Sequence, residues 1–110
     1  MIRVHVGEDD RWQGRPLHEA IIDAARRDDL AGATAYRGIE GYGASSRIHR
    51  PRLLTSSDLP IVVCIVDEAG KIQRFLPTLE RMVGDGLIAI SDVEVIRYTH
   101  REASAPNAAP

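Results

Sequence analysis

Cysteine is almost absent from this chain of 110 residues, which contains Cys64 alone. A single thiol excludes a disulfide within the chain and a zinc site built from several thiolates. Aromatic residues make up 5% of the sequence, and no apolar run approaches the ~18 residues that a membrane span requires. The N-terminus lacks the basic and then apolar pattern of a secretory leader, so we expect a cytoplasmic protein.

Neither sign of charge dominates, because 14 basic and 16 acidic residues give a net charge of -2. No overall field draws the protein onto nucleic acid or anionic lipid, and we expect no nucleic-acid partner. A content of 44% hydrophobic and 27% charged residues is ordinary for one globular domain. We predict a single domain over residues 1–101 and a disordered tail over residues 102–110, which is rich in alanine and proline.

Hydrophobic periodicity predicts the first elements. Residues 1–6 alternate between apolar and polar side chains, as in a half-buried strand. Pro16 suits the first turn of a helix that ends before Gly32. Residues 33–39 are predicted as a second strand, and the β-branched run 59–66 is typical of a central strand.

A second helix is predicted between Glu68 and Gly84, where apolar residues recur at helical spacing. Pro77 lies inside it, so we expect a kink or a break into two shorter helices. Residues 87–90 and 93–98 follow as one interrupted strand or as two short ones.

Two connecting segments carry turn signals. Residues 8–15 are polar and are predicted as a loop, whereas the glycines and serines of residues 38–46 indicate a loop or a bulged strand end.

The order strand, helix, strand, strand, helix, strand predicts an α+β fold of the ferredoxin-like βαββαβ type. Two helices then cover one face of an antiparallel sheet. The other face has to be solvated or covered by another chain. Apolar residues occupy both parities of the predicted central strand, as Val62 and Val63 do. We therefore expect an oligomer with its sheets facing inward.

Groups suited to nucleophilic catalysis are few. Ser45, Ser46 and His49 are close in sequence, but the Gly-x-Ser-x-Gly elbow is absent. Cys64 lies in the most apolar predicted strand, which favours a small buried hydrophobe over a nucleophile. We expect no catalytic residue.

Metal-binding spacing is also missing. The histidines are isolated, and the acidic triplet 8–10 lacks the spacing of a calcium loop. We expect a solvated acidic turn, no metal and no cofactor.

Residues 41–57 contain no acidic side chain but hold Arg47, His49, Arg50 and Arg52. Arginine forks suit phosphate or carboxylate. The alternative is a hairpin whose charges only face solvent.

Two groups of glycines could cradle an anion through backbone N–H groups, or could simply form turns. Gly38, Gly41 and Gly43 precede the basic segment, and Gly84 and Gly86 flank an aspartate. Neither group belongs to a Walker motif, which argues against a P-loop ATPase or kinase.

Three stretches, Gly32–His49, Asp58–Val63 and Met82–Leu87, together resemble a bacterial and archaeal family known as domain of unknown function 190. The start of the chain, Val6–Glu8 followed by Gly14–Leu17, also resembles it. The resemblance covers nearly the whole chain from residue 2 to about residue 98.

That family is similar to the PII signalling proteins, which are trimers of ferredoxin-like subunits that bind adenine nucleotides between subunits. The resemblance implies that residues 42–57 are the counterpart of the mobile PII signalling loop. It also implies that Gly84–Gly86 corresponds to the PII phosphate loop, and residues 96–101 to the C-terminal strand whose arginines reach the phosphates.

The chain departs from the PII pattern at two positions. Leu87 stands where the PII phosphate loop has a lysine, and Met82 or Val83 stands where it has another. Each contact to a charged group contributes roughly 1.5–3 kcal/mol, so the loss of both weakens triphosphate binding in particular. A monophosphate, a cyclic nucleotide or another anion fits better.

The leading hypothesis is a non-enzymatic PII-like regulator, with a small anionic ligand or nucleotide in clefts between the subunits of a trimer. The implied ligand-binding residues are Gly38, Gly41, Gly43, Arg47, Gly84, Asp85, Gly86, Arg97 and Arg101. The implied partner-binding residues of the 42–57 loop are Ser45, Ser46, His49, Arg50 and Arg52. Some family members are encoded beside, or fused to, fluoride-channel-like proteins, which raises a membrane-transport protein as a candidate partner.

Two alternatives remain open. The first is an interaction module without a small ligand, whose Arg50 and Arg52 dock on an acidic surface of a partner. The second is an enzyme that acts on a phosphorylated small molecule with His49 as the acid–base group. No nucleophile, metal set or carboxylate pair accompanies His49, which disfavours the enzyme.

Overall fold

The computed structural model describes residues 1–42, 48–49 and 59–99. Its helices and strands are β1 (Ile2–Gly7), β2 (Arg11–Trp12), β3 (Arg15–Pro16), α1 (Leu17–Arg27), β4 (Ala33–Arg37), β5 (Gly41–Tyr42), β6 (Ile48–His49), β7 (Pro60–Ile65), α2 (Ala69–Met82) and β8 (Leu87–Ile90).

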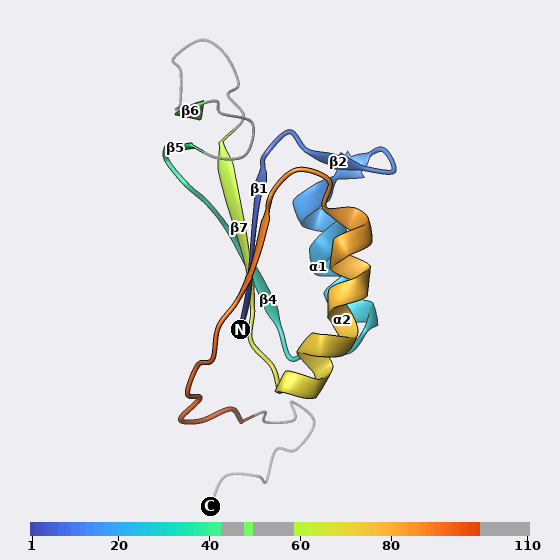
Figure 1. The fold of residues 1–110 in the computed structure, drawn as a ribbon, viewed down its shortest axis with the longest axis vertical. Helices are drawn as coiled ribbons and strands as arrows, with labels where there is room; N and C mark the ends of the chain where they lie inside the picture. Colours follow the sequence, from blue (N-terminus) through green and yellow to red (C-terminus); the bar gives the residue numbers. More distant parts are fainter. Residues whose placement is uncertain (43–47, 50–58, 100–110) are drawn as a thin grey trace, which may run out of the picture.

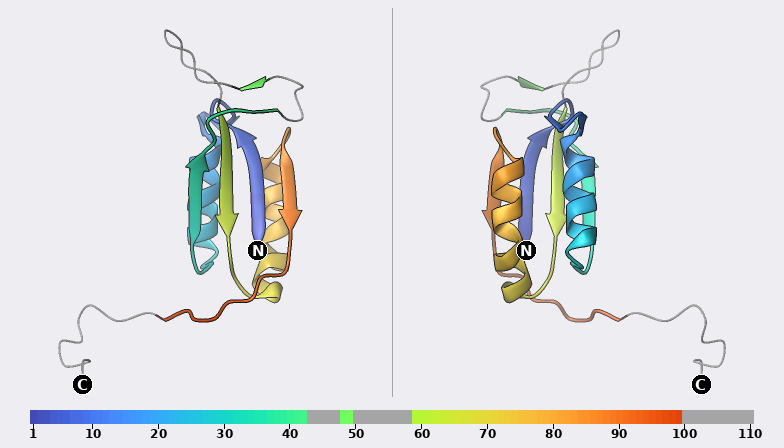
Figure 2. Two further views of the ribbon diagram at one scale, coloured as in Figure 1. Left: turned by 90° about the vertical axis from the view of Figure 1, so that its left-hand side faces the viewer. Right: turned by 90° about the vertical axis from the view of Figure 1, so that its right-hand side faces the viewer.

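Strands β4, β7, β1 and β8 lie side by side in that order, and every neighbouring pair is antiparallel. Both helices lie on the same face of this sheet (Figures 1 and 2). The predicted α+β fold of ferredoxin-like type is thus confirmed.

The core lies between the sheet and the two helices. Ile2, Val4 and Val6 of β1 are paired with Ile65, Val63 and Ile61 of β7, so these six side chains share one face. All are at most 6% exposed. The helices contribute a second buried set, with Leu17, Ala20, Ile21, Ala24 and Ala25 from α1 and Ile72, Phe75, Leu79 and Met82 from α2. Full burial of one such large apolar side chain contributes about 1.5–3 kcal/mol.

The opposite face of the sheet, called the open face below, is covered by neither of the two described helices (Figure 2). The register places Tyr36, Val62, His5 and Leu87 in one row across the four strands. Tyr36 and Leu87 are about half exposed, and Val62 is half-buried. Apolar residues on both sides of the central strand predicted burial of both faces of the sheet. Within this single chain the helix-covered face is buried, whereas the open face is partly exposed. Coverage of the open face by another chain stays a prediction.

The segment 8–15 is more ordered than the predicted loop. Strands β2 and β3 form a small hairpin whose two turn residues, Gln13 and Gly14, have φ angles of 48° and 80°. Positive φ at both positions is the geometry of a tight primed turn. Trp12 packs against the core from this hairpin. The prediction missed it because glutamine is not a usual residue for the first turn position.

Helix α2 passes through Pro77 without ending, so of the two predicted outcomes, a kink or a break, the break is wrong. The proline has no N–H to donate to the carbonyl of Gln73. Phe75 and Leu79, on either side of it, are both buried in the same core. Packing on both sides of the proline therefore compensates for one missing backbone hydrogen bond.

The predicted strand at residues 93–98 is also absent from the structure. Regular pairing of β8 with β1 ends at Ile90, opposite Ile2. The backbone N–H of Ser91 still donates to the carbonyl of Met1 at 3.0 Å, and the Met1 ammonium donates to the carbonyl of Ser91 at 2.7 Å. Residues 92–99 then continue without regular structure along the lower end of the sheet in Figure 1.

Among the described residues, no helix combines the length and the apolar character needed to cross a membrane. The predicted disordered tail, residues 102–110, lies outside the described part of the chain.

Asp67 joins two turns at the lower end of the sheet. Its carboxylate accepts the backbone N–H of Ala31 at 2.9 Å and that of Glu68 at 2.7 Å. Lys71 lies 3.7 Å from the same carboxylate and donates to the carbonyl of Asp29 at 2.7 Å. Burial of the Asp67 side chain, which is 9% exposed, raises its pKa. The two N–H donors and Lys71 outweigh that effect, so the pKa is lowered overall.

Replacement of Asp67 by asparagine should lower the free energy of unfolding by about 1–3 kcal/mol, since charge-assisted hydrogen bonds are lost. Because the folded-state pKa is lowered, the carboxylate stabilises the fold at pH values above its unfolded-state pKa of about 4. This contribution to stability disappears as the pH falls through the folded-state pKa. Urea denaturation at several pH values should therefore show a smaller acid-induced loss of stability for Asp67→Asn than for the wild type.

The matched control is Asp23→Asn. Arg15 hydrogen-bonds this carboxylate and lowers its pKa, but both side chains are about half exposed. A solvated pair of this kind contributes little, so the urea midpoint should stay near that of the wild type. Equal effects of the two substitutions would contradict the role assigned to Asp67.

Candidate functional site

Five of the predicted ligand-binding residues lie at one end of the sheet, the upper end in Figure 1. Pro60 at the start of β7 is paired with Gly7, and it accepts the N–H of Gly38 at 2.7 Å. Leu87 at the start of β8 is paired with His5. The turn that follows β4, with Gly38 and Gly41, and the Gly84–Gly86 turn therefore lie at the same end of the molecule.

Gly38 and Gly41 have a packing role at this end. A Cβ on Gly38 would lie 2.8 Å from Cγ of Pro60, and one on Gly41 would lie 3.1 Å from the same atom. The chain can fold over the Pro60 ring because both residues lack a side chain. These two glycines are explained by the fold without any ligand.

The two glycines of the Gly84–Gly86 turn differ from each other. Gly86 has a φ of 156°, and a Cβ there would lie 2.6 Å from the carbonyl oxygen of His5. This glycine lets β8 approach β1. A Cβ on Gly84 would meet nothing within 4 Å. Gly84 and Asp85 are both exposed, so packing does not account for Gly84.

Two acidic residues form interactions at the upper end of the sheet that the sequence did not predict. The Asp10 carboxylate accepts the N–H of Gly7 at 2.8 Å and closes the turn after β1. Glu8 forms an ion pair with Arg37 at the end of β4. The two partners are 29 residues apart in the chain, and no local pattern indicates such a pair. Since Glu8 already engages Arg37, an anion at this end needs positive charge from elsewhere.

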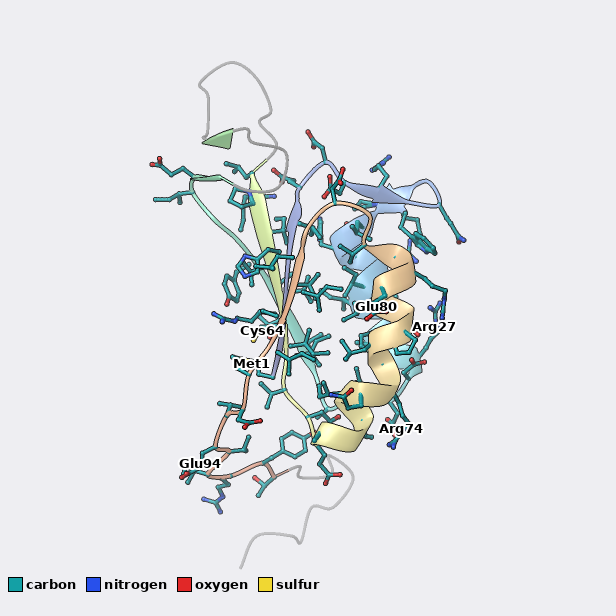
Figure 3. The ribbon with its side chains drawn as sticks, viewed as in Figure 1. Met1, Arg27, Cys64, Arg74, Glu80 and Glu94 are labelled. Carbon is teal, nitrogen blue, oxygen red and sulfur yellow. The ribbon has the colours of Figure 1, made fainter. Side chains whose placement is uncertain are left out.

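Arg97 does not supply that charge within one chain. Its neighbour Tyr98 donates its hydroxyl to the carbonyl of Ala31 at 3.5 Å, just before β4 begins. Glu94, labelled in Figure 3, marks the same lower end. A six-residue strand such as β1 spans roughly 20 Å. The exposed Arg97 is therefore separated from the Gly84–Gly86 turn by the length of the sheet.

The remaining predicted residues, Gly43, Ser45, Ser46, Arg47, Arg50, Arg52 and Arg101, lie outside the described part of the chain. The backbone of His49 belongs to β6, where it is paired with Gly41 of β5. The segment 42–57 therefore begins at the upper end of the sheet, with a short two-stranded ladder within the stretch predicted as a loop.

A broad groove at the lower end was not predicted. It has a volume of about 1400 Å³ and is bounded by the open face, the start of α2 and the segment 91–98. Its lining is mixed, since Tyr36, Val66 and Val95 are apolar whereas Asp67 and Glu68 are acidic. The sequence signal for it was weak, because the groove depends on where the last described residues turn under the sheet.

Cys64 lies on the open face and not in the core. Its thiol is half-buried and donates to the Met1 thioether at 3.3 Å (Figure 3). Within the described residues, no three histidine, cysteine, aspartate or glutamate side chains gather in a way that could hold a metal ion.

The two glycines of the turn should respond differently to alanine. Gly86→Ala should lower the free energy of unfolding by more than about 2 kcal/mol, because the positive φ and the close His5 carbonyl both resist a Cβ. Gly84→Ala should change it by less than about 0.5 kcal/mol. Urea denaturation of both variants checks this difference, and equal stabilities would contradict the packing role of Gly86.

Comparison with known proteins agrees with the resemblance seen in the sequence. Residues 1–95 match the family described as "Uncharacterized ACR", domain of unknown function 190. A UPF0166 protein of Aquifex aeolicus is 39% identical over 97 residues, which cover 87% of this chain and 91% of that protein. A UPF0166 protein of Methanocaldococcus jannaschii is 31% identical over 98 residues, covering 88% and 91%. The chain belongs to the family of domain of unknown function 190.

Proposed function

We propose that this protein is a PII-like regulator that works as an oligomer, with a trimer as the expected form. A small anionic ligand binds between the Gly84–Gly86 turn of one subunit and the C-terminal arginines of the next, Arg97 and Arg101. The loop 42–57 then changes its order or position and carries the signal to a partner protein. A loop that is ordered or released by a ligand is a known switching mode.

The observation that carries the proposal is the separation of Arg97 from the Gly84–Gly86 turn by the length of the sheet. Neither part makes a complete anion site alone, because the turn offers backbone donors and the arginine offers charge. A second copy of the chain can bring the two together. The uncovered open face, with Tyr36 and Leu87 about half exposed, supports the presence of such a copy.

The turn itself also supports a ligand. Gly84 is exposed and has no packing role. An exposed turn of small residues leaves backbone N–H groups accessible to an anion. The loop 42–57 begins at the same end of the sheet, so a ligand held there would lie next to the start of the loop.

The proposed ligand carries less charge than a nucleoside triphosphate. Met82, one of the two candidates for the lysine position before the turn, is 7% exposed and packs in the core. Leu87 replaces the lysine after the turn. A nucleoside monophosphate or a cyclic nucleotide therefore suits the site better than ATP.

Thermal unfolding of the purified protein with a panel of adenine nucleotides, cyclic nucleotides and inorganic anions tests this function. A ligand at one hundred times its Kd stabilises the folded state by about 2.7 kcal/mol. For a chain of this length the midpoint should rise by about ten degrees.

Arg97→Ala should abolish the ligand-induced shift while leaving the ligand-free midpoint unchanged, because Arg97 is exposed. Arg27→Ala is the matched control, since Arg27 is an exposed arginine at the end of α1, on the far side of the molecule from the open face (Figure 3). It should retain the full shift. A shift that survives Arg97→Ala would overturn the assignment of this arginine.

A flat panel would overturn ligand binding altogether. The basic segment would then favour an interaction module in which Arg50 and Arg52 dock on an acidic partner, with a membrane-transport protein as the candidate. Binding of that partner should then be lost on charge reversal of these two arginines.

A further inference from the structure

Residues 92–98, called the C-terminal segment below, have the sequence of a strand but pair with no strand in the described part of the chain. Eight large apolar side chains are exposed in the described part of the chain, and four of them belong to this segment. They are Val93, Val95, Ile96 and Tyr98, with exposures of 47%, 53%, 84% and 68%. A contiguous exposed apolar patch of this kind typically marks an interaction surface.

The segment is held weakly in its present position. Beyond Ser91, the one described hydrogen bond from the segment to the rest of the chain is that of the Tyr98 hydroxyl to the carbonyl of Ala31, at 3.5 Å. That distance is at the outer limit of a hydrogen bond. The β-branched and aromatic residues of the segment favour an extended, paired strand. The segment therefore has the composition of a paired strand but is not paired as one within the described part of a single chain.

The edge of the sheet opposite β8 is formed by β4 and offers a place where a strand can be added. Among the described strands, β4 lies at an edge of the sheet and pairs with β7 alone. The N–H of Gly38 points toward β7 and donates to Pro60. Because backbone direction alternates along a strand, the N–H groups of Ala33, Ala35 and Arg37 point away from β7 toward the free edge. An edge of this kind accepts an added strand.

We propose that the C-terminal segment of one copy adds as a strand to the free edge of β4 in a second copy of the chain. The five residues of β4 are long enough to pair with most of the seven-residue segment. β8 and β4 lie on opposite edges of the sheet, and in one chain the segment passes below the ends of the strands, with Tyr98 beside Ala31, without pairing along the β4 edge.

Strand addition accounts for the apolar residues on both sides of the segment. In an extended strand Val93 and Val95 lie on one face, and Ile96 and Tyr98 lie on the other. One pair would join the open face beside Tyr36, where aromatic and β-branched side chains on neighbouring strands stabilise each other. The other pair would lie on the helix-covered face beside Ala35. Both faces of an added strand would therefore be apolar.

Each chain has one such segment and one such edge, so the contact is head-to-tail and closes into a ring when the rotation between copies allows it. The inference rests on the oligomer of the proposed function but not on its ligand. A failure of ligand binding leaves it untouched.

Backbone hydrogen exchange of the wild type, measured at concentrations where it is oligomeric and where it is not, tests the pairing directly. The amides of Ala35 and Arg37, and the alternate amides among residues 93–97 that face β4, should be protected in the oligomer and should exchange quickly on dilution. An oligomer in which these amides exchange freely would overturn the inference and leave the proposed oligomer standing. A wild type that sediments as a single chain at every concentration would overturn both.

A double substitution with a matched control tests the same pairing. Successive N–H groups of a strand point to opposite sides, so one of those of Val95 and Ile96 must face β4 in an added strand. Val95→Pro combined with Ile96→Pro removes both donors, while Val95→Thr combined with Ile96→Thr keeps two β-branched side chains. Both residues are outside the core, so both variants should unfold like the wild-type single chain. In sedimentation, the proline variant should lose the oligomer and the threonine variant should keep it. An oligomer that persists in the proline variant would contradict the proposal.

Discussion

The pairing of β1 with β7 is the interaction on which the rest of the structure depends. Six residues of each strand are matched in register, and three from each strand form the floor of the core. A shift of one residue would turn those side chains to the open face. The register also determines which ends of the strands meet, and so places the Gly84–Gly86 turn and the start of the 42–57 loop together.

Two helices cover one face of a four-stranded sheet and no more. The chain therefore keeps a half-apolar face, an unpaired β4 edge and an apolar C-terminal segment in one molecule. All three are features that proteins usually hide, because exposed edges and apolar patches promote association. In this chain they are the three features on which the proposed oligomer rests.

The fold could be predicted because its signals are local. Alternation in β1, the helical spacing of α1 and the β-branched run of β7 each indicate their structure within ten or so residues. The hairpin around Gln13 and the unbroken helix at Pro77 could not be predicted in this way. Both depend on packing against distant residues, with Trp12 and Phe75 as the anchors.

The candidate site was harder, because glycine has several uses. The sequence does not distinguish the four glycines from one another. A Cβ on Gly38, Gly41 or Gly86 would make a close steric contact, whereas a Cβ on Gly84 would meet nothing within 4 Å. The Glu8–Arg37 pair depends on contacts between distant parts of the chain and has no sequence signature. Arg97 was grouped with the glycines by resemblance, whereas in one chain it lies at the other end of the sheet.

The position of Cys64 has a practical consequence. It is the single thiol of the chain, and it lies on the open face near the lower end of β7, where no described helix covers it. A reagent that labels thiols would therefore reach it at a rate set by whatever lies over that face. The labelling rate of Cys64 would therefore report in solution, without any substitution, whether a second copy covers the open face as proposed.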